Sequence, residues 1–65
     1  MKDIETIIKA HLDSICKVID KAYKSGLPTS TWRLYLDGAC DLAKALGYTT
    51  NFDPLTNTFT VSKED

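Results

Sequence analysis

The sequence lacks the patterns by which catalytic proteins are most readily identified. It has one histidine, two cysteines and three glycines, and it contains no phosphate-binding glycine loop, zinc-ligand spacing or nucleophile elbow. His11 has no carboxylate three or four residues away along a helix, so a histidine-based acid or nucleophile relay has no partner there. We therefore expect a protein that is not an enzyme and that uses no cofactor.

Metal ligands are equally scarce. Asp37 and Asp41 stand four residues apart, a spacing that would place both carboxylates on one helix face, within reach of a hard cation. No third ligand accompanies them, and two carboxylates at this spacing are typical of a solvated helix face. The sequence therefore predicts no metal site.

An excess of charge of one sign and long apolar runs are also missing. The formal net charge of -1 supplies no basic surface for nucleic acid. Polar or charged residues interrupt the apolar positions between Ile4 and Ala22 every two to four residues. This pattern predicts neither a signal peptide nor a transmembrane helix. We expect a cytoplasmic protein with reduced thiols and no membrane partner.

The two cysteines lie in segments predicted to be helical, on or beside apolar faces. We interpret Cys16 and Cys40 as small buried hydrophobic residues. A disulfide bridge between two packed helices is the alternative, and the sequence alone does not decide between them.

The length of 65 residues predicts a single domain over residues 1–65. A chain of this size hides only about 60% of the surface that its unfolded form exposes, so its stability is marginal. Small domains often gain stability from disulfides, metals or further subunits. Hydrophobic residues make up 43% of the chain and charged residues 26%, which is ordinary for a folded domain.

A long first helix is predicted over about residues 3–25. Asp3 suits the N-cap position, and Gly26 suits the left-handed residue that follows a helix. On its polar face, oppositely charged residues recur four apart in the favourable order, which predicts two ion pairs on a solvated surface. These pairs are Asp13 with Lys17 and Asp20 with Lys24.

A second helix is predicted over about residues 30–46, between the hydroxyl of Thr29 or Ser30 as N-cap and Gly47 as the residue after the helix. Gly38 interrupts it at a cost of about 1 kcal/mol relative to alanine. With Leu34 and Ala45, this glycine forms a small-residue ridge beside the main apolar stripe.

Residues 48–62 alternate between apolar and polar positions and predict a β-hairpin. Asp53 and Pro54 favour a type I turn, and Asn57 tolerates the left-handed conformation needed to re-enter the second strand. A four-residue loop pairs Phe52 with Phe59, and the opposite surface of the hairpin is polar. The edges of such a hairpin are free to pair with another chain unless they are blunted.

These segments predict an α+β fold of order ααββ, in which two antiparallel helices pack against a C-terminal β-hairpin. The predicted core comprises Ile8, Leu12, Ile15, Ile19, Ala22, Leu36, Ala39, Leu42, Ala43, Leu46, Phe52, Phe59 and Val61.

The apolar arc of the first helix spans roughly 180°, whereas a surface helix needs little more than about 100°. The excess predicts a protein interface, and we expect a homodimer in which His11 sets the register. Trp32 and Tyr35 are candidate anchors for a larger protein partner; alternatively, Trp32 caps the end of the bundle against Leu27 and Tyr48. By analogy with other short proteins, an accessory, adaptor or inhibitor role is expected. The predicted interface residues are Ile4, Ile7, His11, Val18, Trp32 and Tyr35.

An alternative interpretation is a DNA-binding regulator. Residues 22–36 resemble a helix-turn-helix: Ala22 is followed four residues later by Gly26, then by an aliphatic residue and hydroxyl-rich positions that open a helix. The resemblance implies that the start of the second helix enters the major groove. The long first helix, Ser25 at a position that is usually apolar, and the net negative charge depart from the pattern, so nucleic acid is the less favoured partner. The residues that would face DNA are Thr29, Ser30, Thr31 and Arg33.

Overall fold

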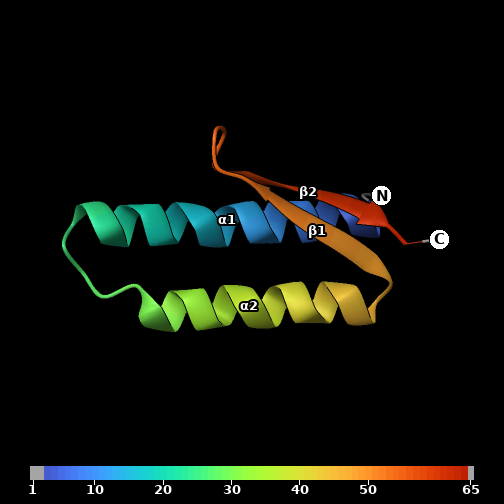
Figure 1. Ribbon diagram of the computed structural model, residues 1–65, viewed down its shortest axis with the longest axis horizontal. Coiled ribbons are helices and arrows are strands. Elements are labelled where there is room, and N and C mark those ends of the chain that lie inside the picture. The colour runs from blue at the N-terminus through green and yellow to red at the C-terminus, as the bar shows by residue number, and fades with distance from the viewer. Residues whose placement is uncertain (1–2, 65) are drawn as a thin grey trace.

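The computed structural model describes residues 3–64, so the prediction of one domain over residues 1–65 extends beyond the described residues at both ends. Two helices are followed by a two-stranded antiparallel hairpin (Figure 1). The predicted α+β fold of order ααββ is confirmed. The elements are α1 (Ile4–Lys24), α2 (Ser30–Ala45), β1 (Tyr48–Asp53) and β2 (Thr58–Lys63).

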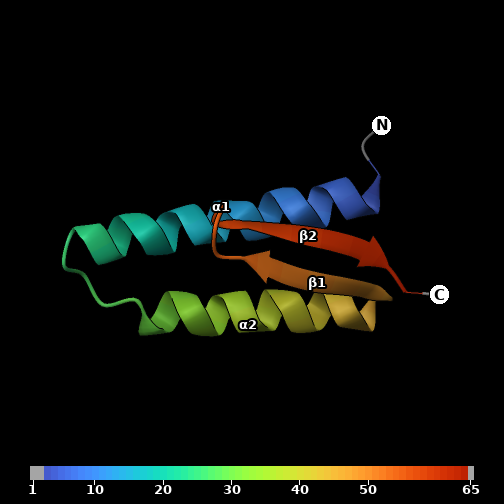
Figure 2. The same ribbon diagram turned by 45° about the horizontal axis from the view of Figure 1, so that its top comes forward.

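The elements form two layers. The helices run antiparallel and side by side, and the hairpin lies across one face of the pair, with β2 against α1 and β1 against α2 (Figures 1 and 2). The hairpin turn reaches only about the middle of α1, so the hairpin does not cover the full length of the helices (Figure 2). A six-residue strand spans about 20 Å, whereas the 21 residues of α1 span about 31 Å. The hairpin is therefore too short to cover the helix pair.

Both ends of α1 follow the prediction. The backbone N–H of Thr6 donates to Asp3 Oδ1 at 2.7 Å, which makes Asp3 the N-cap. After the helix, Gly26 adopts a φ of 74°. The N–H groups of Gly26 and Leu27 then donate back to the carbonyls of Tyr23 and Ala22. This is the Schellman arrangement, which satisfies carbonyls that the last turn would otherwise leave unpaired.

The start of α2 differs from the prediction. Thr29 is the N-cap residue, but its side chain makes no capping hydrogen bond. Its backbone has a φ of -110° and a ψ of -5°, whereas capping hydroxyls usually sit on extended backbone from which they reach the first free N–H groups. At the other end, Gly47 adopts a φ of 90° as expected.

The hairpin has the predicted register. Phe52 pairs with Phe59, and their ring centroids lie 5.2 Å apart. In the turn, the N–H of Leu55 donates to Asp53 Oδ1 at 2.9 Å, and Asn57 has a φ of 55°. Both turn residues therefore act as the sequence predicts.

One side of α1 holds the outer edge of β2. Asp13 Oδ1 accepts a hydrogen bond from the N–H of Phe59 at 2.7 Å, and Lys9 Nζ donates to the carbonyl of Phe59 at 2.8 Å. Lys9 and Asp13 also form an ion pair at 2.7 Å. The predicted pairing of Asp13 with Lys17 is therefore wrong, because Asp13 turns toward the strand and meets Lys9 instead. The pairing of Asp20 with Lys24 is confirmed.

The core lies between the hairpin and the helices. Leu12 is its most deeply buried residue and packs in one cluster with Cys16, Phe59 and Val61. Cys16 is buried and Cys40 is half-buried, and both are free thiols, so the bridge does not form. The buried residues are Leu12, Ile15, Cys16, Ala22, Ala43, Phe59 and Val61.

Three residues predicted for the core lie at the surface. Leu42 and Leu46 are 63% and 59% exposed, and Phe52 is 46% exposed. The leucines face the side of the helix pair that the hairpin leaves bare, and Phe52 lies where the hairpin stops short of the helix ends. Ile8, Ile19, Leu36 and Ala39, also predicted for the core, are half-buried. Neither helix in the described part of the chain is long and apolar enough to cross a bilayer.

Candidate functional site

An apolar groove of about 550 Å³ runs between α1 and α2. All of its lining residues belong to the helices or to the residue that follows α2, and none comes from the hairpin. The groove therefore opens on the face of the helix pair that the hairpin leaves bare. We call this surface the apolar groove, and it is lined by Ile4, Ile7, Ile8, His11, Leu12, Tyr35, Gly38, Ala39, Leu42, Ala43 and Leu46.

Four of the six predicted interface residues line this groove: Ile4, Ile7, His11 and Tyr35. Ile4, Ile7 and Tyr35 are each more than half exposed. On an isolated chain this leaves about half of each of these large residues in water, and covering an isoleucine would gain part of the roughly 1.5–3 kcal/mol that full burial provides. The groove thus has the composition of a surface that another molecule covers.

Val18 and Trp32 lie outside the groove lining. At 100° per residue, Val18 falls on the same side of α1 as His11, two turns further along, and it is 37% exposed. Because the helices are antiparallel, the first turn of α2, which carries Trp32, lies beside the C-terminal half of α1 (Figure 1). These two residues extend the apolar surface past the end of the groove.

The aromatic rings of His11, Tyr35 and Trp32 form a continuous row that begins in the groove and ends at Trp32. The ring of Tyr35 meets that of His11 edge-on at a centroid distance of 5.9 Å, and it meets that of Trp32 edge-on at 6.2 Å. Trp32 remains 40% exposed. It cannot cap the bundle against Tyr48, because Trp32 lies in the first turn of α2 and Tyr48 follows the other end, about 20 Å away along the helix. Tyr48 packs instead against the core cluster.

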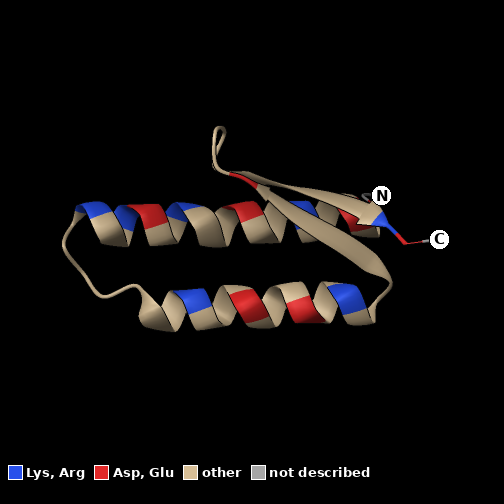
Figure 3. Cartoon of the chain, viewed as in Figure 1, with Lys and Arg blue, Asp and Glu red and all other residues tan. Residues whose placement is uncertain are grey.

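None of the groove-lining residues within residues 3–64 is charged. Among these lining residues, only His11 and Tyr35 have polar side-chain groups. Acidic and basic residues mix along both helices, and neither helix presents a continuous patch of one sign (Figure 3). Within residues 3–64, no group of three or more histidine, cysteine, aspartate or glutamate side chains could hold a metal ion. The groove can offer apolar contact and one imidazole, that of His11.

Gly38, Leu42 and Leu46 are groove residues that the sequence did not predict for this surface. The leucines were expected in the core, and the glycine on a minor ridge. An atom added at the Cβ position of Gly38 would meet nothing within 4 Å, so the backbone of α2 is bare at this point. A single hairpin can cover only one face of a helix pair, and this is the sequence signal that could have revealed the uncovered face.

The helix pair does not have the geometry of a helix-turn-helix. In that motif the two helices cross at about 90–120°, whereas α1 and α2 run antiparallel (Figure 2). Arg33, expected to face DNA, lines a second cavity on the hairpin side together with Asp37. Thr29, Ser30 and Thr31 lie at the start of α2.

No protein-family model, curated protein or solved structure matches this chain. Its function must therefore be inferred from the groove and from the chemistry of its residues.

Proposed function

We propose that this protein is a non-enzymatic interaction module that forms a homodimer through the apolar groove. The observation that carries the proposal is the exposure of large apolar side chains along both walls of the groove, where none of the described lining residues is charged. Contiguous exposed apolar surface that is rimmed by polar residues is typical of protein interfaces.

The size of the molecular surface supports a second copy as the occupant. The chain exposes 5014 Å², whereas a compact monomer of 7.2 kDa is expected to expose about 4,100 Å². The excess of about 900 Å² matches the roughly 800 Å² that each partner buries in an interface of standard size. One broad face of the molecule, about 40 by 23 Å, is large enough to supply that area.

A two-fold axis would bring the groove of one protomer against the groove of its mate. Because such an interface is isologous, the same residues contribute from both sides. The two helix pairs would then stack face to face as a four-helix bundle of two layers. One hairpin would lie on each outer face of the bundle. Ile7 and Leu42, one from each wall of the groove, would fill the space between the pairs.

Within this dimer, His11 would lie in an apolar seam. A single polar residue in such a seam restricts the alignments in which it can be satisfied, and so it sets the register. Val18 would extend the contact along α1. Trp32 and Tyr35 lie toward one end of the surface, and we propose them as anchors for a larger protein, consistent with an accessory, adaptor or inhibitor role in the cytoplasm.

Analytical ultracentrifugation of the wild type and of Ile7→Asp tests the dimer. The wild type is expected to sediment at twice its monomer mass of 7.2 kDa. Ile7→Asp is expected to be monomeric, because a carboxylate in the interface would be desolvated without a partner. Ile7 is 53% exposed, so the substitution spares the monomer fold. Leu55→Asp is the matched control, since Leu55 lies in the hairpin turn and is 95% exposed. A wild-type protein that sediments as a monomer at high micromolar concentration would contradict the proposal.

A further inference from the structure

The two edges of the hairpin differ. The outer edge of β2 is covered, because the N–H and the carbonyl of Phe59 bond to the side chains of Asp13 and Lys9 on α1. These outward groups mark the pair of Phe59 with Phe52 as one that makes no hydrogen bonds between the strands. The N–H and carbonyl of Phe52 therefore also point outward, from the opposite edge.

The same alternation applies along the whole of β1. Every second residue of an antiparallel strand directs its N–H and carbonyl away from its partner, so Tyr48, Thr50 and Phe52 do so on β1. Gly47 and Glu64 are the adjacent positions beyond the pair of Tyr48 with Lys63, and the alternation predicts that they bond to each other. They do, because the N–H of Glu64 donates to the carbonyl of Gly47 at 2.7 Å. Within residues 3–64, no side chain bonds to the outward groups of these three residues. We call this row of groups the open edge.

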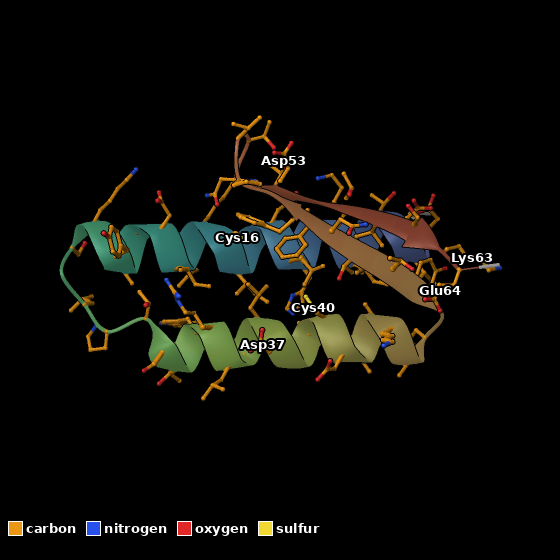
Figure 4. All side chains as sticks on the ribbon, in the orientation of Figure 1. Cys16, Asp37, Cys40, Asp53, Lys63 and Glu64 are labelled. Atoms are coloured by element: carbon orange, nitrogen blue, oxygen red, sulfur yellow. The ribbon has the colours of Figure 1, made fainter. Side chains whose placement is uncertain are left out.

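A second cavity, of about 520 Å³, borders the open edge at Phe52. It lies on the hairpin side of the helices, where the hairpin stops short of their ends. Its apolar lining includes Cys16, Ile19, Leu36 and Phe52. Cys16 and Asp37 mark the α1 and α2 sides of this region in Figure 4.

We propose that the open edge of β1 binds an extended peptide segment of another protein as a third strand, with one bulky apolar side chain of that segment in the second cavity. Strand addition draws affinity from backbone hydrogen bonds and specificity from pockets that receive alternate side chains. The molecule offers both features at one place. This inference does not depend on the dimer, because the apolar groove lies on the other face of the helix pair.

The cavity favours a peptide over a second copy of this chain. The open edge of a second copy is its own β1, whose inward side chains already pack on its own helices: Tyr48 contacts the core cluster and Phe52 meets Phe59. Those side chains are not available to enter a neighbour's cavity. Arg33 and Asp37 line the cavity with opposite charges, so an uncharged apolar side chain is the expected occupant.

The probe is a capped hexapeptide with the sequence of β2, Thr-Phe-Thr-Val-Ser-Lys, because it alternates apolar and polar residues and is already compatible with β1. Titration into the ¹⁵N-labelled protein is expected to shift the amide signals of Thr50 and Phe52, together with those of Ile19 and Leu36. Two further peptides carry N-methyl groups on their backbone. One is N-methylated at its Phe and Val residues, and the other at its Thr and Ser residues. Only one edge of an added strand faces β1, so one of these two peptides should lose about tenfold in affinity while the other binds normally.

The protein variant is Thr50→Pro, which removes an outward N–H without removing a bond inside the hairpin; proline is tolerated in strands at such edge positions. It should retain the wild-type fold by circular dichroism and lose about tenfold in peptide affinity. Thr50→Val, which keeps the N–H, is the matched control and should bind normally. If Thr50→Pro does not fold, the wild-type protein with the two N-methylated peptides decides the proposal, because equal binding of both peptides overturns it.

Four other results would overturn the proposal. The first is the absence of amide shifts at millimolar peptide. The second is a set of shifts confined to the apolar groove, at Ile7 and Leu42. The third is equal binding by both N-methylated peptides. A dimer mass that Thr50→Pro abolishes and Ile7→Asp does not would assign the open edge to a second copy, and would overturn both this inference and the proposed dimer. Loss of the dimer in Ile7→Asp alone leaves peptide binding unaffected.

Discussion

Asp13 Oδ1 accepts a hydrogen bond from the backbone N–H of Phe59 at 2.7 Å, joining α1 to β2 across 46 positions of the chain. Lys9 completes the contact by donating to the carbonyl of Phe59. Phe59 is buried in the core cluster, so these bonds fix the position at which the hairpin lies on the helices. A two-stranded hairpin is marginal by itself, and its attachment to α1 is the basis of the first two predictions.

Asp13→Ala is expected to lower the free energy of unfolding by about 1.5–3 kcal/mol, because it removes a hydrogen bond with a charged acceptor and leaves the N–H of Phe59 without its partner. Urea denaturation followed by circular dichroism measures the change. Asp20→Ala is the control, since Asp20 forms only an exposed ion pair with Lys24 and should cost less than about 1 kcal/mol. Equal losses in the two variants would contradict a special role for Asp13.

Stability is expected to fall in acid through the same residue. Desolvation raises the pKa of Asp13, but the hydrogen bonds from Lys9 and Phe59 and the charges of Lys9 and Lys17 outweigh it, so its pKa lies below the ordinary value of 3.8. A lowered folded-state pKa stabilises the fold above the unfolded-state value, and this stabilisation is lost as pH falls through the folded-state pKa. Unfolding midpoints at pH 6 and below pH 3 should therefore differ less in Asp13→Asn than in the wild type.

The N-cap contributes to this acid response in the same direction. The N–H and the hydroxyl of Thr6 lower the pKa of Asp3. The double variant Asp3→Asn with Asp13→Asn should therefore show a smaller loss between pH 6 and pH 3 than either single variant. An undiminished loss would place the acid-sensitive group elsewhere in the chain.

Local sequence signals predict the elements of this fold well. Asp3, Gly26, Gly47 and Asn57 each act through the backbone conformation or hydrogen bond of their own segment, and each was correctly placed. Thr29 is the exception, because its backbone is not extended and its side chain makes no capping hydrogen bond. Turn and cap chemistry is readable because its partners lie within a few residues in sequence.

Only some of the groove residues were predicted. A helical wheel shows which residues form an apolar face, but it does not show which part of that face a neighbouring element covers. Leu42 and Leu46 share the stripe of Ala43, yet Ala43 is buried and the leucines are exposed. The pairing of Asp13 with Phe59 was missed for the same reason, since it depends on where the hairpin crosses α1. Burial in this chain follows from the placement of a short hairpin on long helices, which no local pattern encodes.

The two thiols are expected to react at different rates. Burial raises the pKa of the Cys16 thiol, and the nearby charge of Asp13 and the Cys40 thiol raise it further. The thiolate is the reactive form, so iodoacetamide should modify half-buried Cys40 well before buried Cys16. Timed alkylation with mass spectrometry of the two tryptic peptides gives both rates. In urea the rates should converge, and a difference that persists there would not come from burial.

The proposed dimer should weaken on acidification. Histidine side chains in general gain their charge between neutral and mildly acidic pH, and among residues 3–64 His11 is the one histidine that lines the groove. Sedimentation at pH 7.5 and pH 5 should show dissociation at the lower pH. His11→Leu should remain dimeric at both values. Dissociation of His11→Leu at pH 5 would assign the response to another group.

Gly38→Ala separates the stability of the monomer from the geometry of its interface. Gly38 lies inside α2 without a left-handed backbone, and an added methyl group would meet nothing within 4 Å. The substitution should therefore stabilise the monomer by about 0.5–1 kcal/mol. Gly47→Ala should destabilise it, because Gly47 has a φ of 90°, which L-residues rarely adopt. Thermal unfolding in the monomeric Ile7→Asp background measures both effects. In the wild-type background, Gly38→Ala should raise the dimer dissociation constant if a partner helix approaches α2 closely at this point, so opposite signs in the two backgrounds would place Gly38 within the contact.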